Sequence, residues 1–429
     1  MAIVKPFKGT RYSEKTGTLE ELCCPPYDII SEEGRKALLA TNPHNIIRLE
    51  LPRSYKDGTE NEDMQSYTEA GKVVNDWVDS GILVDDANEN IYVYEFSFKH
   101  EGEIRAVKGF VALVELEEFS AGIVLPHEET LSKAKTDRFN LMTATKCNFS
   151  QVYSLYSDKS GELQDVLENA TSNEPTSQFT DDGDVTHKLW LVSDADAIVQ
   201  IQNQMSDKQV FIADGHHRYE TALKYSKENS GGTAAYVPMM LVSMDNPNLI
   251  VFPTHRLVRD LPNFNYAEMV EKCREYFYIK EELSREDAFS KLGEAFDKKL
   301  HAFALYAGGG EYALLILKDK AVMESIMPND HQSLRSLDVS VLHSLILERV
   351  FKIDKANMAA QTNLTYVKVA DDAIDAVDNG TANCCFLLNA TRVNEISDVA
   401  LSGGKMPQKS TYFYPKLTTG LVINRIFKA

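Results

Sequence analysis

The segment "FIADGHHRYETA" (211–222) places an acid, two histidines and an arginine within five residues. An apolar run ends at Ala213 and a helical pattern starts near Arg218, so the segment predicts a strand, a tight turn at Gly215 and a helix. Free N–H groups and the macrodipole make a helix N-terminus an anion site, and Arg suits bidentate contact with phosphate. We therefore predict a phosphate site at the turn, formed by Gly215, His216, His217 and Arg218. We expect His217 and Asp214 to act in catalysis, and Asp214 to bind magnesium or orient a histidine.

Two other interpretations apply to this segment. The polar residues of an Asp/Gly turn can simply cap a surface helix, although caps rarely need two histidines and an arginine together. A zinc site could combine Asp214, His216 and His217 with His127 or His255. Adjacent histidines point in different directions, which makes a single zinc ion an awkward fit. Phosphate binding is the interpretation that we favour.

The segment "LPHEETLSKAKTDR" (125–138) is the second candidate. Pro126 keeps the chain extended, and His127 and Glu128 follow in a loop, where catalytic residues often lie. If Glu128 faces the phosphate site, it could take a proton from a hydroxyl nucleophile, a role typically worth about 10²–10⁴ in rate. Most His-Glu pairs are simply solvated, and the spacing alone leaves both interpretations open.

Two further segments carry candidate binding groups. "MPQKSTYFYPK" (406–416) offers Lys409, Ser410 and Thr411 to a carboxylate or phosphate, or is a β-edge segment with cross-strand aromatics. "FPTHRLV" (252–258) presents Thr254, His255 and Arg256 in the same way, although a buried-strand histidine fits equally well. We interpret His343, on an apolar helix, as a packing residue.

Composition excludes several classes of function. The formal net charge of -19 argues against a nucleic-acid partner, since phosphate backbones need a basic face. Six cysteines without CxxC spacing fit a reducing compartment. There is no apolar signal region at the N-terminus and no run of about 18 apolar residues. These features predict a soluble, cytoplasmic protein without a membrane partner.

The order of predicted elements indicates a mixed α+β fold. Residues 91–98 and 104–116 read as a hairpin, as do "HAFALYA" and "YALLILK" around Gly308–Gly310. We also predict a hairpin between 234–244 and 249–258, and helices from Ser31, near 60–80, from about Thr136, over 194–205 and over 337–350. With 429 residues the chain should form two or three subdomains. The common nucleotide motifs GxxxxGK[ST] and GxGxxG are absent, as are HExxH and GxSxG.

Six motifs in order make the chain resemble the domain of unknown function 1015 family over nearly its whole length. They are "PPYDIISEE", "NPHNIIRLELP", "LPHEETLSKAKTDR", "ADGHHRYETAL", "LDVSVLH" and "MPQKSTYFYPK". That family is similar to the ParB/sulfiredoxin-like superfamily and, within it, to the free serine kinases. The resemblance implies a ParB/sulfiredoxin-like core at 96–260, with α/β regions at 1–95 and 261–429, the last binding substrate.

The resemblance also implies roles for the candidate residues. Glu128 would deprotonate the serine hydroxyl, and residues 214–218 would hold the phosphoryl donor and its Mg²⁺. His127, Thr254, His255, Arg256, Lys409, Ser410 and Thr411 would contact the substrate, although Thr411 stands where those kinases have an arginine.

The sequence therefore predicts a monomeric or homodimeric enzyme that makes O-phosphoserine from free L-serine, with pyrophosphate, or else ADP or ATP, as donor. A phosphoserine phosphatase using the same site is one alternative. A non-catalytic ParB-like nucleotide-binding protein is another.

Overall fold

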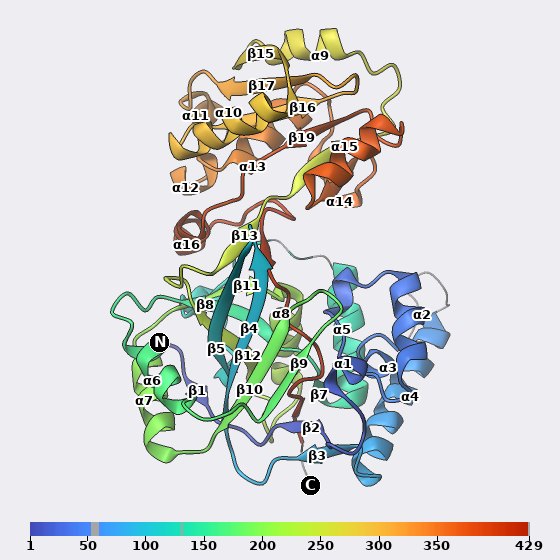
Figure 1. The fold of residues 1–429 in the computed structure, drawn as a ribbon, viewed down its shortest axis with the longest axis vertical. Coiled ribbons are helices and arrows are strands. Elements are labelled where there is room, and N and C mark those ends of the chain that lie inside the picture. Colours follow the sequence, from blue (N-terminus) through green and yellow to red (C-terminus); the bar gives the residue numbers. More distant parts are fainter. Residues whose placement is uncertain (53–59, 129, 131, 428–429) are drawn as a thin grey trace. The chain divides into compact units, whose positions relative to one another are not determined.

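The computed structural model describes the chain apart from residues 53–59, 129, 131 and 428–429. The chain forms two compact units. Unit 1 comprises Met1–Pro126, Thr130–Leu249 and Pro415–Ala429, and unit 2 comprises His127–Glu129 and Ile250–Tyr414. Each unit combines helices with sheets, which confirms the mixed α and β class (Figure 1). The three-part division at residues 95 and 260 stays a prediction.

Unit 1 is built on a mixed sheet of nine strands. In spatial order these are β6 (Val124–Leu125), β11 (Val210–Asp214), β8 (Val152–Tyr156), β12 (Tyr236–Ser243), β5 (Glu103–Glu115), β4 (Ile91–His100), β10 (Thr186–Val192) and β9 (Ser177–Thr180), with β1 (Val4–Lys5) paired to β5. The β6–β11 and β8–β12 pairs are parallel. The β4–β5 pair is antiparallel and confirms the predicted hairpin.

Helices surround this sheet, and two short strand pairs complete unit 1. The helices are α1 (Leu19–Leu22), α2 (Glu32–Thr41), α3 (Ile47–Glu50), α4 (Glu60–Asp79), α5 (Ser132–Thr145), α6 (Glu162–Ala170), α7 (Ala195–Met205) and α8 (His216–Glu228), with 3₁₀ turns at Tyr27–Ile29 and Phe119–Ala121. The strand pairs are β2 (Thr10–Tyr12) with β3 (Leu83–Asp85), and β7 (Cys147–Asn148) with β21 (Asn424–Arg425). Ser31 caps α2 as predicted, since its Oγ accepts the Gly34 N–H at 3.0 Å. The α5 helix begins earlier than the predicted start near Thr136.

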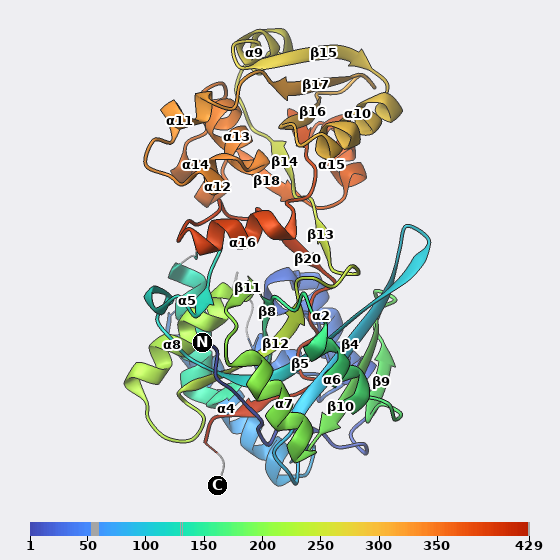
Figure 2. The same cartoon turned by 90° about the vertical axis from the view of Figure 1, so that its left-hand side faces the viewer.

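Unit 2 contains an antiparallel sheet of six strands, and Figure 2 shows α10 and α15 along it. In spatial order the strands are β15 (Phe277–Leu283), β17 (Tyr312–Leu317), β16 (Ala302–Tyr306), β19 (Cys384–Leu387), β14 (His255–Val258) and β18 (Leu364–Val367). A separate pair joins β13 (Ile250–Phe252) to β20 (Tyr412–Tyr414). The helices are α9 (Tyr266–Cys273), α10 (Arg285–Asp297), α11 (Val322–Ile326), α12 (Gln332–Arg335), α13 (Asp338–Val341), a π-helix (Leu342–Glu348), α14 (Lys355–Ala360), α15 (Ala370–Asp378) and α16 (Val393–Leu401).

The predicted hairpin between 234–244 and 249–258 is wrong. The β12 strand pairs with β5 and β8, whereas β13 pairs with β20, and β14 pairs with β18 and β19. A turn signal such as "DNPN" reports only local chain reversal, and strand partners are chosen by packing with distant segments. The β16–β17 hairpin, by contrast, is confirmed.

Two general properties follow from the described residues. None of the six cysteines, all of which lie in this part of the chain, forms a disulfide. Within the same residues, no helix combines the length and the apolar character needed to cross a membrane.

Candidate functional site

The predicted strand, turn and helix at 209–229 are all present in unit 1. The β11 strand ends at Asp214, and its pairing with β8 shifts register between Ile212 and Asp214, an irregularity of the kind that re-aims side chains. Gly215 follows in the left-handed region with φ +91°, and α8 begins at His216. A Cβ atom on Gly215 would lie 2.8 Å from Nε of Arg218, so the guanidinium group lies over the turn, and the positive φ favours glycine there.

Asp214 holds two cations in place. Its Oδ1 accepts from Nζ of Lys416 at 2.6 Å, and its Oδ2 accepts from Nη2 of Arg218 at 2.7 Å. Burial by itself would raise the pKa of Asp214, but the positive charges of Lys416 and Arg218 outweigh burial and hold this pKa well below its usual range. The carboxylate therefore stays ionised and fixes both cations beside the turn.

Arg218 makes fewer hydrogen bonds than its guanidinium group can donate. Its Nη1 donates to the Gln151 carbonyl at 2.5 Å and its Nη2 to Asp214. Its Nε is buried and has no hydrogen-bond partner among the residues that the structure describes. A buried N–H of a charged group without a partner is costly, and its presence points to a ligand or water in that position.

The start of α8 adds further anion-binding groups. Gly215 is the N-cap residue of α8 and has no side chain that could cap this end of the helix. His216 is buried and His217 is partly exposed. The helix N-terminus, Arg218 and Lys416 together give a positive site suited to phosphate oxygens.

Contacts with Thr130 and with Lys135 of α5 brace the α8 helix. Glu220 accepts from Thr130 Oγ1 at 2.9 Å and from Lys135 Nζ at 2.7 Å. These bonds join the segment that follows the predicted His127–Glu128 loop to the phosphate-site helix within unit 1.

In unit 2 the structure joins two segments that the sequence presents separately. Glu128 forms a parallel bridge with Met406, and the Met406 N–H donates to the His127 carbonyl at 2.7 Å. The Lys409 N–H donates to Oε1 of Glu128 at 2.8 Å. Lys409 adopts φ +57°, an unfavourable value for a residue other than glycine, and such strain is concentrated at functional sites.

The remaining members of this group, His127, Ser410 and Thr411, lie around the same loop. His127 is fully buried, and its Nε2 lies 3.0 Å from Oγ1 of Thr411. Ser410 is also buried, with its Oγ donating to the Pro407 carbonyl at 2.5 Å. His127, Glu128, Lys409, Ser410 and Thr411 thus form one group, with Glu128 held by backbone.

Thr254, His255 and Arg256 are buried at β14. The Leu388 N–H donates to Nδ1 of His255 at 3.2 Å, and burial, followed by the charge of Arg256, lowers the His255 pKa to about 4. Burial also lowers the pKa of Arg256 to about 10, against the opposing influence of Tyr366 and Glu128. Substrate contact by these three residues stays a prediction.

The sequence interpretation missed several residues. Lys416 was inside a quoted motif but was not singled out, and only its contact with Asp214 identifies it. His343, interpreted as packing, accepts from Nε of Arg256 at 3.3 Å through Nε2. A buried network in unit 1 joins Arg138 to Glu50 at 3.4 Å and places the Arg138 guanidinium 4.1 Å from the ring centroid of Tyr27. No local pattern marks these pairs, because their members are far apart in the chain.

The environment of Asp214 does not fit the predicted magnesium ligand. Both carboxylate oxygens accept from cations, and magnesium prefers several oxygen ligands in near-octahedral geometry. Among the described residues, no group of three or more His, Cys, Asp or Glu side chains could hold a metal ion, which also applies to the zinc alternative. Asp214 acts here as an anchor for Lys416 and Arg218.

Several solved structures share low similarity with this chain. A free serine kinase in complex with AMP is 14% identical, with a TM-score of 0.38, covering 71% of this chain and 91% of that chain. A mutant free serine kinase in complex with ADP is 13% identical, with a TM-score of 0.37 and the same coverage. A conserved hypothetical protein from Pyrococcus furiosus is 13% identical, with a TM-score of 0.36, covering 71% of this chain and 94% of that one.

Comparison with protein families gives a more extensive match. None of the curated proteins matches the chain. The family model described as "Protein of unknown function (DUF1015)" matches residues 4–340, well over half of the sequence. This range contains the His127–Glu128 loop and the 214–218 turn, in agreement with the resemblance inferred from the motifs. The chain belongs to the DUF1015 family.

Proposed function

We propose that this protein is a phosphotransferase that makes O-phosphoserine from free L-serine. The observation that carries the proposal is the guanidinium of Arg218, which lies over the 214–218 turn at the start of α8 with its buried Nε unpartnered among the described residues. The choice of free L-serine as the acceptor rests on the resemblance of the motifs to free serine kinases. The ParB/sulfiredoxin-like core that this resemblance implies is part of the same proposal.

In this proposal the donor's phosphates bind in unit 1, at the 214–218 turn and Lys416. Arg218 and Lys416 neutralise charge on the phosphate oxygens, and the first N–H groups of α8 supply further donors. Asp214 keeps both cations oriented, so little reorganisation is needed when charge moves towards the leaving group. His217, partly exposed at the first turn, would donate to the same oxygens.

Glu128 is the proposed general base. The Lys409 N–H holds Oε1 and the Met406 bridge fixes the backbone, so the carboxylate has a defined direction. The serine Oγ forms a bond to the terminal phosphorus of the donor, and the bond from that phosphorus to the bridging oxygen breaks. The hydroxyl proton passes to Glu128, and the leaving phosphate or nucleotide takes the electron pair of the broken bond.

Pyrophosphate is the donor that we propose, with ADP or ATP as the alternatives. The choice rests on the full-length resemblance to the longer, pyrophosphate-using kinases. Because both carboxylate oxygens of Asp214 accept hydrogen bonds from cations, no step is assigned to a protein-bound metal. Magnesium would neutralise the donor's own oxygens.

Phosphorus NMR tests the proposal directly. Purified protein is incubated with L-serine and magnesium, with pyrophosphate, ADP or ATP in parallel tubes, and a fourth tube contains O-phosphoserine alone. We expect an O-phosphoserine signal with pyrophosphate. Hydrolysis of O-phosphoserine without formation in the other tubes would favour the phosphatase. Silence in every tube would overturn the enzymatic proposal and leave a nucleotide-binding role.

A further inference from the structure

Unit 2 contains a cavity of about 370 Å³, and Met406 is the one lining residue that already has a role above. Its wall is formed by α11, α12, α13, the π-helix, α14 and residues 405–408. Apolar side chains such as Met327, Leu334 and Met358 provide much of the surface. This volume is at the lower end of the range for small-molecule pockets and is ample for a ligand of amino-acid size.

Two buried polar groups at this cavity have unused hydrogen-bonding capacity. Ser340 lines the cavity and is 2% exposed, and its Oγ has no partner among the described residues. Arg256 lies behind the wall, in contact with the lining residues His343 and Tyr366, and its Nη2 is likewise unpartnered within the described chain. Buried polar groups are nearly always satisfied, so these two point to a polar ligand or ordered water.

One segment of the cavity wall has an unusual secondary structure. Residues 342–348 form a π-helix, and its members His343, Ser344 and Glu348 face the cavity. Pi-helical turns are rare and occur often at functional sites. Through this π-helix, the ring of His343, which accepts the hydrogen bond from Arg256, lies on the same wall of the cavity as Ser340.

The charges of the wall have both signs. Lys355 and Lys405 are exposed cations on the lining, and Asp330 and Glu348 are carboxylates there. None of these four side chains has an ion-pair partner in the part of the chain that the structure describes. Unpaired groups of opposite sign beside apolar side chains match a ligand that carries both an ammonium and a carboxylate group.

We propose that this cavity binds a free α-amino acid with an apolar side chain, at a site separate from the serine acceptor. The ligand's carboxylate is recognised by Ser340 and the cations, its ammonium group by Asp330 or Glu348, and its side chain by the methionines. Methionine-lined surfaces accept side chains of varied shape, which suits such a ligand.

Calorimetric titration with L-norleucine tests the proposal on the full chain. Two analogues test its charged groups: hexanoate lacks the ammonium group and pentylamine lacks the carboxylate. We expect L-norleucine to bind, and each analogue to bind at least about tenfold more weakly, since each loses a charge-assisted contact. Binding of hexanoate as tight as that of L-norleucine would overturn the assigned ligand class.

Matched variants test the location. Ser340→Ala and Lys405→Gln should each weaken L-norleucine binding by about threefold to tenfold. Lys320→Gln, an exposed lysine of unit 2 that does not line the cavity, should leave it unchanged. Lys405 is exposed, so its variant keeps the test valid if Ser340→Ala folds poorly. Unchanged affinity in Lys405→Gln and in a folded Ser340→Ala, or no binding by the natural protein at about 10 mM, would refute the proposal.

Discussion

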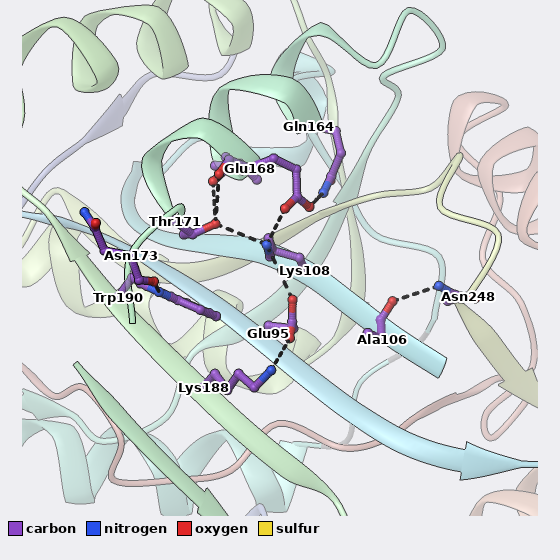
Figure 3. Close-up of polar contacts among 11 residues, drawn as sticks. Glu95, Ala106, Lys108, Gln164, Glu168, Thr171, Asn173, Lys188, Trp190 and Asn248 are labelled. Carbon is purple, nitrogen blue, oxygen red and sulfur yellow. Dashed lines mark hydrogen bonds and ion pairs between the residues drawn. The ribbon is translucent and has the colours of Figure 1, made fainter. Parts of the chain in front are cut away.

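Two buried cations, Lys108 in unit 1 and Arg256 in unit 2, are accommodated in opposite ways. Figure 3 shows Lys108 between Glu168, Thr171 and Glu95, at 2.6, 3.1 and 3.5 Å from its Nζ. Arg256 is fully buried, yet it donates to the neutral acceptors His343 and the Thr254 carbonyl, and its Nη2 has no partner within the described residues.

This difference distinguishes a cation that stabilises the fold from one that can bind a ligand. A buried charge is costly unless opposite charge and hydrogen bonds compensate it, and the Lys108 cluster provides both from the chain itself. Arg256 and Arg218 each keep an N–H unused by the described chain, and each lies at a candidate binding region. The fold satisfies Lys108, and this cation stabilises it, whereas Arg256 and Arg218 each keep a donor available to a ligand.

The largest predicted effect concerns Glu128. Glu128→Gln keeps the size of the side chain and an oxygen for the Lys409 N–H but removes the base. Turnover of L-serine should fall by about 10²–10⁴, with little change in melting temperature. Steady-state kinetics and a thermal melt check this. Near-normal turnover in the folded variant would remove Glu128 from the role of base.

The Lys108 cluster gives the next largest effect, on stability. Lys108→Met should lower the free energy of unfolding by about 3 kcal/mol, because Glu95 and Glu168 lose their shared cation. Lys188→Met is the matched control. Lys188 is more exposed and bonds only to Glu95 in this cluster, so its loss should cost under about 1 kcal/mol. Denaturant unfolding of both variants measures the difference, and equal losses would contradict the comparison.

The third prediction uses pH. The folded-state pKa of His255 is about 4, below the ordinary 6.5. Above pH 6.5 this lowered pKa contributes its full amount to the free energy of unfolding, and the contribution is lost as the pH falls towards 4. At pH 5 the loss is about 2 kcal/mol relative to neutral pH. His255→Asn keeps an acceptor for the Leu388 N–H and should lose this part of the pH dependence. His331→Asn, an exposed control, should keep it. Parallel pH slopes for natural protein and His255→Asn would disprove the assignment.

Local sequence patterns predicted the strands and helices that carry the site more reliably than they predicted the contacts within the site. The turn from Asp214 to α8 was predicted because glycine, apolar residues and polar residues follow one another within a few positions. The bond from Lys409 to Glu128 and the pair Lys416–Asp214 were not predictable, since each joins segments about 200 or more residues apart. The wrong hairpin at 234–258 failed for the same reason.

Burial was the second property that the sequence did not reveal. The structure buries Arg256 of "FPTHRLV" in β14 against His343, which the residues of this segment do not indicate, and its contact with a substrate stays a prediction. The π-helix at 342–348 also has no simple pattern, because "LDVSVLHSLIL" satisfies an α-helical period. Only the packed structure shows which polar groups remain without partners.

Pyrophosphate binding by Arg218→Gln is the decisive measurement for the proposed phosphate site. Calorimetric titration compares the natural protein, Arg218→Gln and the control Lys188→Gln, with ADP titrated in parallel. Arg218→Gln should weaken donor binding by about tenfold or more, while Lys188→Gln should leave it unchanged. Equal donor affinity in the natural protein and a folded Arg218→Gln, or binding of neither pyrophosphate nor ADP by the natural protein, would contradict a phosphate site at the 214–218 turn.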